Sequence, residues 1–190
     1  MSARIEVAGR NELADTLRDG LGRLGHMVVV GEDLDAFVEV HVASSTGRAI
    51  EDYDDDAFRS CWETPLRDVV AHFVDARARG ARRFVIVTSS SGMTGAATDA
   101  PVAMASDALR SFMKSVARQW GSEGRTVNTV VVDPVLLGSA PETVSIAPRA
   151  LGSVGTGQWD VAPVVAFCCS DDSHHLTGST LMADGGSWMP

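Results

Sequence analysis

Short runs rich in Val and Ile alternate along this chain with longer segments whose apolar residues recur every three or four positions. Such runs predict strands, and such spacing predicts helices with one apolar face. The predicted strands are Arg4–Gly9, Met27–Gly31, Ala36–Ala43, Arg83–Thr88, Val127–Asp133 and Thr180–Asp184. The predicted helices are Glu12–Gly25, Thr64–Arg79, Val102–Trp120 and Val161–Ser170. This alternation predicts one α/β domain over residues 1–190, a doubly wound parallel sheet with helices on both faces.

Composition excludes several classes of protein. The formal charge is −9, with 16 Lys and Arg against 25 Asp and Glu, and this acidic balance argues against nucleic acid as the main partner. No run of about 18 apolar residues is present, so we expect no membrane span. The three Cys residues are too few for a disulfide framework, and the N-terminus has no apolar signal-peptide core. We therefore expect reduced thiols in a cytoplasmic protein.

Tyrosine and lysine each occur once, at Tyr53 and Lys114, which are 61 positions apart. A phenol with a pKa near about 10 is a poor acid or base at neutral pH unless a neighbouring cation lowers that pKa. Chemistry that needs a Tyr beside a Lys must therefore bring together these two residues, which lie in different segments.

Three segments in the second half of the chain resemble the short-chain dehydrogenase/reductase family. RGARRFVIVTSSSGMTG is similar to the family's strand and catalytic Ser loop, and ALRSFMKSVARQWGSEGRTVNTVVVDP to its long helix and the next strand. The ending VAPVVAFCCSDDSHHLTGSTLMADGGSWM is similar to its C-terminal signature. The resemblance implies a Rossmann-like fold, here with a shortened N-terminal half. It also implies a nicotinamide cofactor and a Ser, a Tyr and a Lys that together reduce a carbonyl group.

Most of the residues that the family uses for catalysis are replaced in this chain. Aligning the Ser loop and the long helix puts the family's Tyr at Val102 and its Lys at Ser106. A shift of one residue gives Ala103 and Asp107 instead, which serve no better. Ser89 is retained, although a lone Ser on a turn is more often structural. The resemblance implies further pocket-lining residues at Met93, Pro134, Val135 and Ser139.

The turn after the first predicted strand does not have the glycines that let a dinucleotide approach a helix N-terminus. Gly9 stands alone and is followed by Arg10, Asn11 and Glu12, whose side chains would block the pyrophosphate, and Glu12 would repel it. Only 35 residues precede the strand at 36–43, so at least one strand–helix unit of the cofactor half is missing. We therefore expect no nicotinamide cofactor.

Other groups of polar residues offer weaker hypotheses. Two adjacent pairs near the C-terminus have the side-chain types that bind metals: Cys168, Cys169, His174 and His175. Adjacent Cys residues on a helix point about 100° apart, so we expect no metal site. Asp133 and His41 could form an acid–base pair at the carboxyl ends of strands, and Glu32 or Asp33 could bind a ribose.

The function that these observations favour is that of a catalytically silent subunit with the fold of this family. By resemblance, the two long helices and the C-terminal tail pair with neighbouring subunits. Four apolar residues there are candidate contacts: Phe112, Met113, Trp120 and Trp188. The partner would be a second copy or an active homologous dehydrogenase. Two alternatives stay open. One is a lyase, isomerase or cyclase whose remodelled pocket takes a hydrophobic small molecule, and the other is an atypical oxidoreductase.

Overall fold

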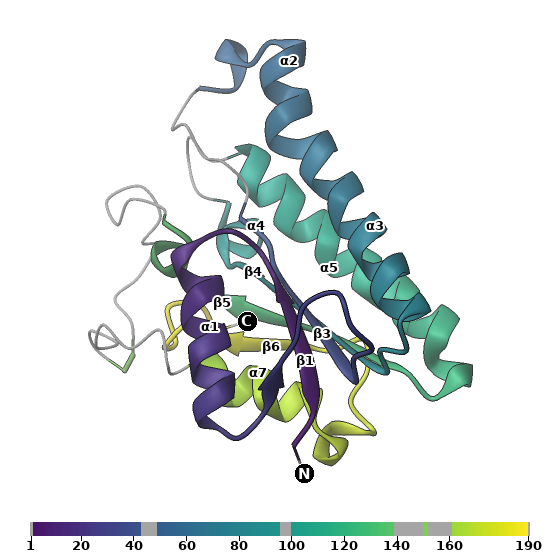
Figure 1. The fold of residues 1–190 in the computed structure, drawn as a ribbon. Coiled ribbons are helices and arrows are strands. Elements are labelled where there is room, and N and C mark those ends of the chain that lie inside the picture. The colour runs from purple at the N-terminus through teal and green to yellow at the C-terminus, as the bar shows by residue number, and fades with distance from the viewer. Residues whose placement is uncertain (1, 43–48, 96–99, 139–149, 152–160, 190) are drawn as a thin grey trace.

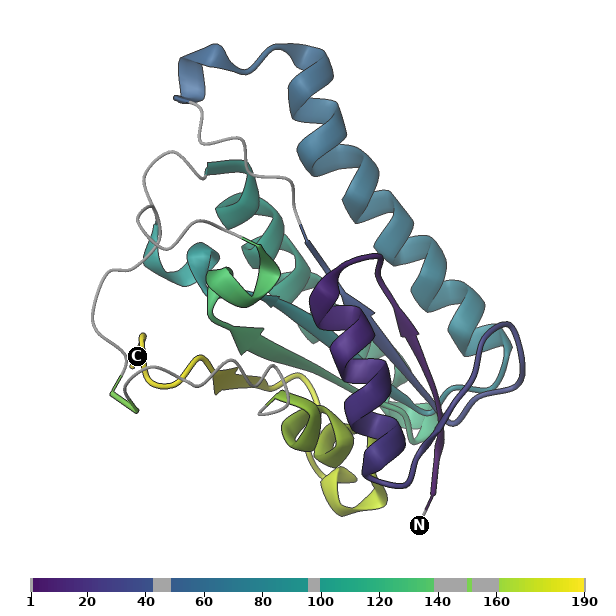
Figure 2. The same ribbon diagram turned by 60° about the vertical axis from the view of Figure 1, so that its left-hand side comes forward.

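The computed structural model describes residues 2–42, 49–95, 100–138, 150–151 and 161–189. Within these residues, the centre of the fold is a six-stranded parallel sheet in the order β2-β1-β3-β4-β5-β6. The strands are β1 (Arg4–Ala8), β2 (Met27–Val28), β3 (Ala36–Val40), β4 (Arg83–Ser89), β5 (Thr126–Val132) and β6 (Thr180–Ala183). Helices α1 (Glu12–Arg23) and α7 (Ala162–Cys169) cover one face of the sheet, and α3 (Thr64–Ala78) and α5 (Ala100–Trp120) cover the other (Figure 1, Figure 2). This arrangement confirms the predicted fold class.

The core has two layers, one on each face of the sheet. On the first face, Leu13, Leu17 and Leu21 of α1 are fully buried, as their helical spacing predicts. On the second face, Phe73 of α3 is fully buried, and its ring centroid lies 5.6 Å from that of Phe37 in β3. Both layers therefore fix the helices that border the carboxyl ends of β1 and β3.

The N-terminal half of the sheet is shortened. Strand β2 contains only Met27 and Val28, which pair with Arg4 and Ile5 at the start of β1. Residues 29–35 then lead directly into β3, with no helix between the two strands. This agrees with the prediction that a strand–helix unit is missing.

Helix α3 begins at Thr64, as predicted, but further helical residues precede it. Asp54 caps α2 (Asp55–Phe58) by accepting a hydrogen bond from the Ala57 N–H at 2.7 Å, and a π turn over Arg59–Glu63 connects α2 to α3. The turn already interrupts the usual hydrogen-bond ladder, so Pro65 can follow it without removing a further backbone bond. The remaining short helices are α4 (Ser91–Thr94) and the 3₁₀ turns Ile50–Asp52, Gly121–Glu123, Pro134–Leu137 and Asp171–Ser173. None of the helices in the part of the chain that the structure describes is both long and apolar enough to cross a membrane.

Candidate functional site

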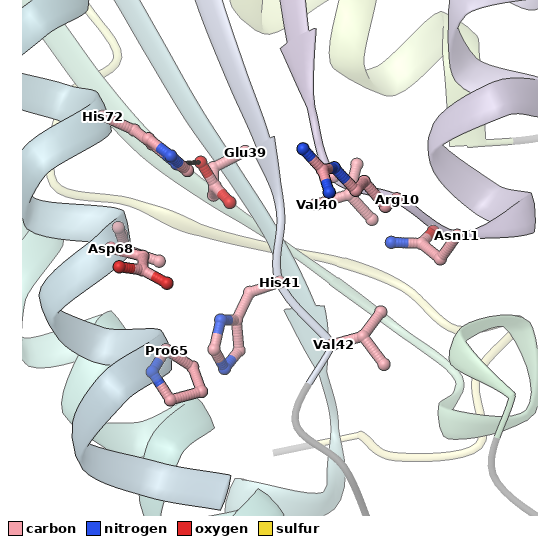
Figure 3. Close-up of a pocket in the computed structure, with 11 residues that line it drawn as sticks. Arg10, Asn11, Glu39, Val40, His41, Val42, Pro65, Asp68 and His72 are labelled. Carbon is pink, nitrogen blue, oxygen red and sulfur yellow. Dashed lines mark hydrogen bonds and ion pairs between the residues drawn. The ribbon is translucent and has the colours of Figure 1, made fainter. Parts of the chain in front are cut away.

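The sheet has a switch point between β1 and β3, because the chain runs from β1 outward to β2 and then places β3 on the other side of β1. In open parallel sheets the loops diverge at such a point, and ligands bind there, outside the carboxyl ends of the strands. A cavity of about 640 Å³ lies at this place. One wall is the turn between β1 and α1, and the other is formed by the end of β3 and one side of α3 (Figure 3).

The side chains after Gly9 were expected to fill the space beside the β1–α1 turn. A cavity lies there instead. Gly9 has a φ of +124°, and a Cβ atom there would lie 3.0 Å from the carbonyl oxygen of Val40, so the position requires Gly. Arg18 fixes the turn by donating a hydrogen bond to the Gly9 carbonyl oxygen at 2.7 Å. Arg10 lines the cavity with an exposed side chain, whereas Glu12 is not among the residues that line it.

The opposite wall carries four titratable side chains: Glu39, His41, Asp68 and His72 (Figure 3). The side chain of Glu39 is 8% exposed, and its Oε2 atom lies 2.9 Å from Nδ1 of His72. Burial raises the pKa of Glu39, the bond to His72 opposes this rise, and the charge of Asp68 adds to it. The result is a buried carboxylate that is held by an imidazole at the edge of a cavity.

His41 follows the last residue of β3, two positions beyond Glu39. Burial lowers the pKa of His41 to about 4, so its imidazole is neutral at physiological pH. Its Nε2 atom is buried and has no hydrogen-bond partner among the described residues. The structure does not bring it to Asp133, because β4 lies between their strands and separates them by about 10 Å. The Asp133 carboxylate instead accepts a hydrogen bond from the Val135 N–H at 2.9 Å.

Ser89 and the two replaced positions, Val102 and Ser106, are buried and do not line this cavity. Ser89 is buried at the end of β4, where its hydroxyl donates to Oγ of Ser91 at 2.8 Å and accepts from the Ser91 N–H at 3.1 Å. Val102 and Ser106 are buried on α5, and Oγ of Ser106 accepts a hydrogen bond from Thr88 at 3.2 Å. Neither of the two positions therefore carries an ionisable group.

The single Tyr and the single Lys lie apart. Tyr53 lines a cavity of about 220 Å³ together with Met104 near the start of α5. Lys114 is exposed on the same helix, ten residues beyond Met104, which corresponds to about 15 Å along the helix axis. The fold therefore does not assemble a Tyr–Lys pair from these residues.

The other candidate residues do not join the switch-point cavity. Pro134 is buried, Met93 and Val135 are partly buried, and none of the three lines it. Ser139 lies outside the described residues. In the segments that the structure describes, no three His, Cys, Asp or Glu residues are arranged to hold a metal ion. Burial raises the pKa of the Cys168 thiol to about 11, as expected for an inert buried thiol.

Three of the four residues expected at an interface, Phe112, Met113 and Trp120, pack in the chain's own core, and the interface itself stays a prediction. Met113 is 1% exposed. Phe112 and Trp120 contact buried aromatic rings at centroid distances of 5.6 and 4.8 Å. The backbone N–H of Trp188 donates to the Asp184 carboxylate at 2.9 Å. The large apolar residues that α3 and α5 expose are Val70, Val74 and Met104.

Sequence reasoning missed the acidic wall of the cavity. Glu39 and His41 stand two positions apart in an otherwise apolar strand, and Asp68 and His72 stand four positions apart on a helix. Each pair shares one face of its element, and this spacing was the available signal. No feature of the sequence shows that the strand face with Glu39 packs against the helix face with His72.

The parallel sheet and its switch-point cavity define this chain as a Rossmann-like α/β protein. A family model described as enoyl-(acyl carrier protein) reductase matches residues 26–187. The 3-oxoacyl-[acyl-carrier-protein] reductase FabG of Salmonella typhimurium is 34% identical over 113 residues, which make up 56% of this chain and 46% of that protein. The short-chain dehydrogenase/reductase aba4 of Botryotinia fuckeliana is 32% identical over 115 residues, 53% of this chain and 44% of that protein.

Solved structures extend the likeness to the whole fold. A Serratia marcescens short-chain dehydrogenase/reductase with two substitutions superimposes with a TM-score of 0.76 at 19% identity, covering 97% of this chain and 96% of that one. A Thermus thermophilus protein gives a TM-score of 0.74 at 18% identity, covering 98% and 99%. The chain belongs to the short-chain dehydrogenase/reductase family. It spans about half the length of the curated relatives that it matches.

The expectation of no nicotinamide cofactor is wrong. The matching family model and the FabG relatives are reductases, and a reductase of this family takes its hydride from a nicotinamide nucleotide. The expectation assumed that side chains fill the turn after β1, whereas a cavity opens there. The residues present fit a nucleotide. Arg10 offers a positive charge to its phosphates beside the N-terminus of α1, and Glu39 offers an acceptor to a sugar hydroxyl. The nucleotide, when bound, would supply the hydride.

Proposed function

We propose that this chain is a nucleotide-binding subunit with the short-chain dehydrogenase/reductase fold that does not complete carbonyl reduction by itself. Its role would be to associate with a second copy or with an active homologous dehydrogenase. The proposal is supported by Val102 and Ser106, two buried residues on α5 at the positions where the resemblance puts the family's Tyr and Lys.

Proton transfer is the step that these residues cannot supply. A carbonyl that accepts a hydride must also receive a proton on its oxygen, and this proton comes from a group with a pKa near the working pH. Val102 has no proton to give, and the Ser106 hydroxyl has no cation beside it in the described contacts. Ser89 could still polarise a carbonyl, although its hydroxyl is engaged with Ser91.

Association is supported by the apolar side chains that α3 and α5 expose. Val70, Val74 and Met104 are 44%, 59% and 41% exposed. Val70 and Val74 are four residues apart and so lie on one face of α3. By resemblance, these two helices pair with a neighbouring subunit in the family. Burying such residues would stabilise a complex by about 25 cal/mol for each Å² of apolar surface removed from water.

The proposed lack of carbonyl reduction is tested by incubating the purified chain with an acetoacetyl thioester and either NADH or NADPH. Oxidation of the nucleotide is followed by the absorbance of its dihydronicotinamide band. We expect no oxidation above the rate without protein, while titration with the same nucleotides reports binding. The Escherichia coli 3-oxoacyl-[acyl-carrier-protein] reductase FabG, which is 33% identical over 113 residues, serves as the active control. Turnover by the chain alone would refute the proposal.

The test of association uses two matched substitutions of exposed valines. Val74→Glu places a charge on the α3 face, whereas Val30→Glu places one on a loop residue that is 80% exposed. We expect light scattering to show an oligomer for the unaltered chain and for Val30→Glu, and a monomer for Val74→Glu. Identical masses for the two variants would remove α3 from the interface.

A second candidate function is supported by the contact between Glu39 and His72. A carboxylate bonded to an imidazole can accept and return a proton without a redox step, as a lyase or isomerase requires. The charged walls of the cavity would suit a polar ligand in that case. This candidate predicts that His72→Gln loses a lyase or isomerase activity of the chain. The control is His174→Gln, which alters an exposed histidine and should keep full activity.

A further inference from the structure

A second cavity, of about 350 Å³, lies between the second half of α5 and the residues that precede β6. The residues that line this α5–β6 cavity are Lys114, Ala117, Arg118, Thr177 and Gly178. Gly178 stands two positions before the first residue of β6, so the cavity lies at the amino end of this edge strand. The switch-point cavity lies at the carboxyl ends of β1 and β3, and the two cavities share no lining residue. They are therefore separate.

Hydrogen bonds from β5 fix the wall of the α5–β6 cavity that precedes β6. The fully buried side chain of Asn128 donates to the Leu176 carbonyl oxygen at 2.7 Å and accepts from the Ser179 N–H at 3.2 Å. Between these two contacts, the Gly178 N–H donates to the Val127 carbonyl oxygen at 2.7 Å. This wall is therefore already in place before any ligand binds.

Thr177 adds a hydrogen-bond donor to the same wall. Its Oγ1 atom accepts a hydrogen bond from the Val127 N–H at 3.1 Å. A hydroxyl that accepts a bond still has one proton to donate, and the described residues offer no acceptor for it. The proton is therefore available to a ligand in the cavity.

The opposite wall, on α5, carries two positive charges. Lys114 and Arg118 are exposed and four positions apart, so they lie on one face of the helix. Most of the arginines that the structure describes form ion pairs with carboxylates, whereas these two cations have no ion-pair partner among the described residues. None of the described residues that line the cavity is acidic, although the chain has 25 Asp and Glu against 16 Lys and Arg.

The end of α5 accounts for only one of these cations. A cation in the last turn of a helix is stabilised by the free carbonyl groups there, and this effect falls off within that turn. Arg118 lies in the last turn of α5, whereas Lys114 lies six residues before the final residue, Trp120. The position of Lys114 beside Arg118 is therefore not explained by the end of the helix.

We propose that the α5–β6 cavity binds a phosphate group with two negative charges, held by Lys114, Arg118 and the Thr177 hydroxyl. A guanidinium can donate two parallel hydrogen bonds to two phosphate oxygens, and an ammonium acts on them as a compact charge. A carboxylate has one charge and two oxygens, so it would satisfy fewer of these donors. The proposal does not depend on nucleotide binding at the switch-point cavity.

The test is a titration of the ¹⁵N-labelled chain, followed by the NMR signals of the Thr177 and Gly178 amides. The probes are inorganic phosphate, glycerol 3-phosphate and acetate, at pH 8 and one ionic strength, where a phosphate with a second pKa near about 6 is doubly charged. We expect saturable shifts with both phosphates and binding of acetate that is at least about fivefold weaker. The phosphate that binds more tightly shows whether the ligand is the free ion or an organic ester.

Substitutions assign the binding to the two cations. Lys114→Gln and Arg118→Gln should each weaken phosphate binding about fivefold, which is the effect of one charge about 4 Å away in water. Lys114→Arg keeps the charge and should bind within about twofold of the unaltered chain. Arg23→Gln removes the same charge from α1, on the other face of the sheet, and should leave the dissociation constant unchanged.

Three results would overturn the proposal. The first is that neither phosphate shifts the Thr177 and Gly178 signals. The second is that the double variant of Lys114 and Arg118 binds as tightly as the unaltered chain. The third is an equal loss in Arg23→Gln, which would assign the binding to net charge rather than to this cavity. Both cations are exposed, so we expect their variants to fold, and thermal unfolding checks this.

Discussion

We predict that His41 makes the stability of the folded chain depend on pH. Its imidazole is buried and does not take up a proton in the folded chain. It is 5% exposed, and burial lowers its pKa to about 4, against 6.5 for an unperturbed His. As the pH falls below about 6.5, the unfolded chain binds a proton at this residue and the folded chain does not. Its contribution to stability is therefore complete above pH 6.5 and is lost as the pH falls towards 4.

The size of the effect follows from the gap between the two pKa values. Each pH unit of that gap is worth about 1.4 kcal/mol. The loss should approach about 3 kcal/mol at pH 4 and reach about 2 kcal/mol at pH 5. Such an amount is a large part of the net stability of a domain, which is about 5–15 kcal/mol.

The assay is urea unfolding at pH 7 and pH 5 for the unaltered chain, for His41→Gln and for His174→Gln. The loss of free energy of unfolding between the two pH values should be about 2 kcal/mol smaller for His41→Gln than for the other two proteins. Glu39 has a raised pKa and acts in the opposite direction, but it is present in all three proteins. Equal losses in His41→Gln and in the unaltered chain would refute the reasoning.

Three further predictions concern the core and the turn after β1. Phe73→Ala empties a fully buried ring site and should lower the free energy of urea unfolding by about 3–5 kcal/mol, and a loss under about 1 kcal/mol would contradict the packing described. Gly9→Ala should lower the Tm, since φ is +124° and the new Cβ would meet Val40, whereas Gly22→Ala in α1 meets nothing within 4 Å and should raise it. Ellman's reagent should react slowly with the buried cysteines of the native chain and at once with the unfolded chain, so rapid native labelling would contradict their burial.

Local patterns predicted most of the secondary structure. The Leu repeat after Asn11 gave a helix with its apolar face in the core, and the side chain of Asn11 accepts a hydrogen bond from the Ala14 N–H as a cap should. The start of α3 at Thr64 was predicted, whereas the π turn over Arg59–Glu63 that precedes it was not. A π turn is defined by the backbone hydrogen bonds of its residues, and the side chains of residues 59–63 do not indicate those bonds.

The candidate site was predicted less well, because its two walls come from segments far apart in the chain. Arg10 follows β1, Glu39 lies in β3, and His72 lies on α3, 33 residues beyond Glu39. Interpreted in isolation, Arg10 obstructs a phosphate; in the fold, it lines an open cavity. The prediction of no cofactor rested on these side chains, and the family match and the reductase relatives contradict it.

The amino-acid sequence by itself determined the order of strands and helices and the identities of the residues at 102 and 106, because periodicity and residue identity are local properties. Only the tertiary structure decided that β2 stops below the rim and that Glu39, Asp68 and His72 lie on one wall of a cavity. Contacts between distant segments depend on how the sheet and its helices pack, and so the charge of a site emerges only when the chain is folded.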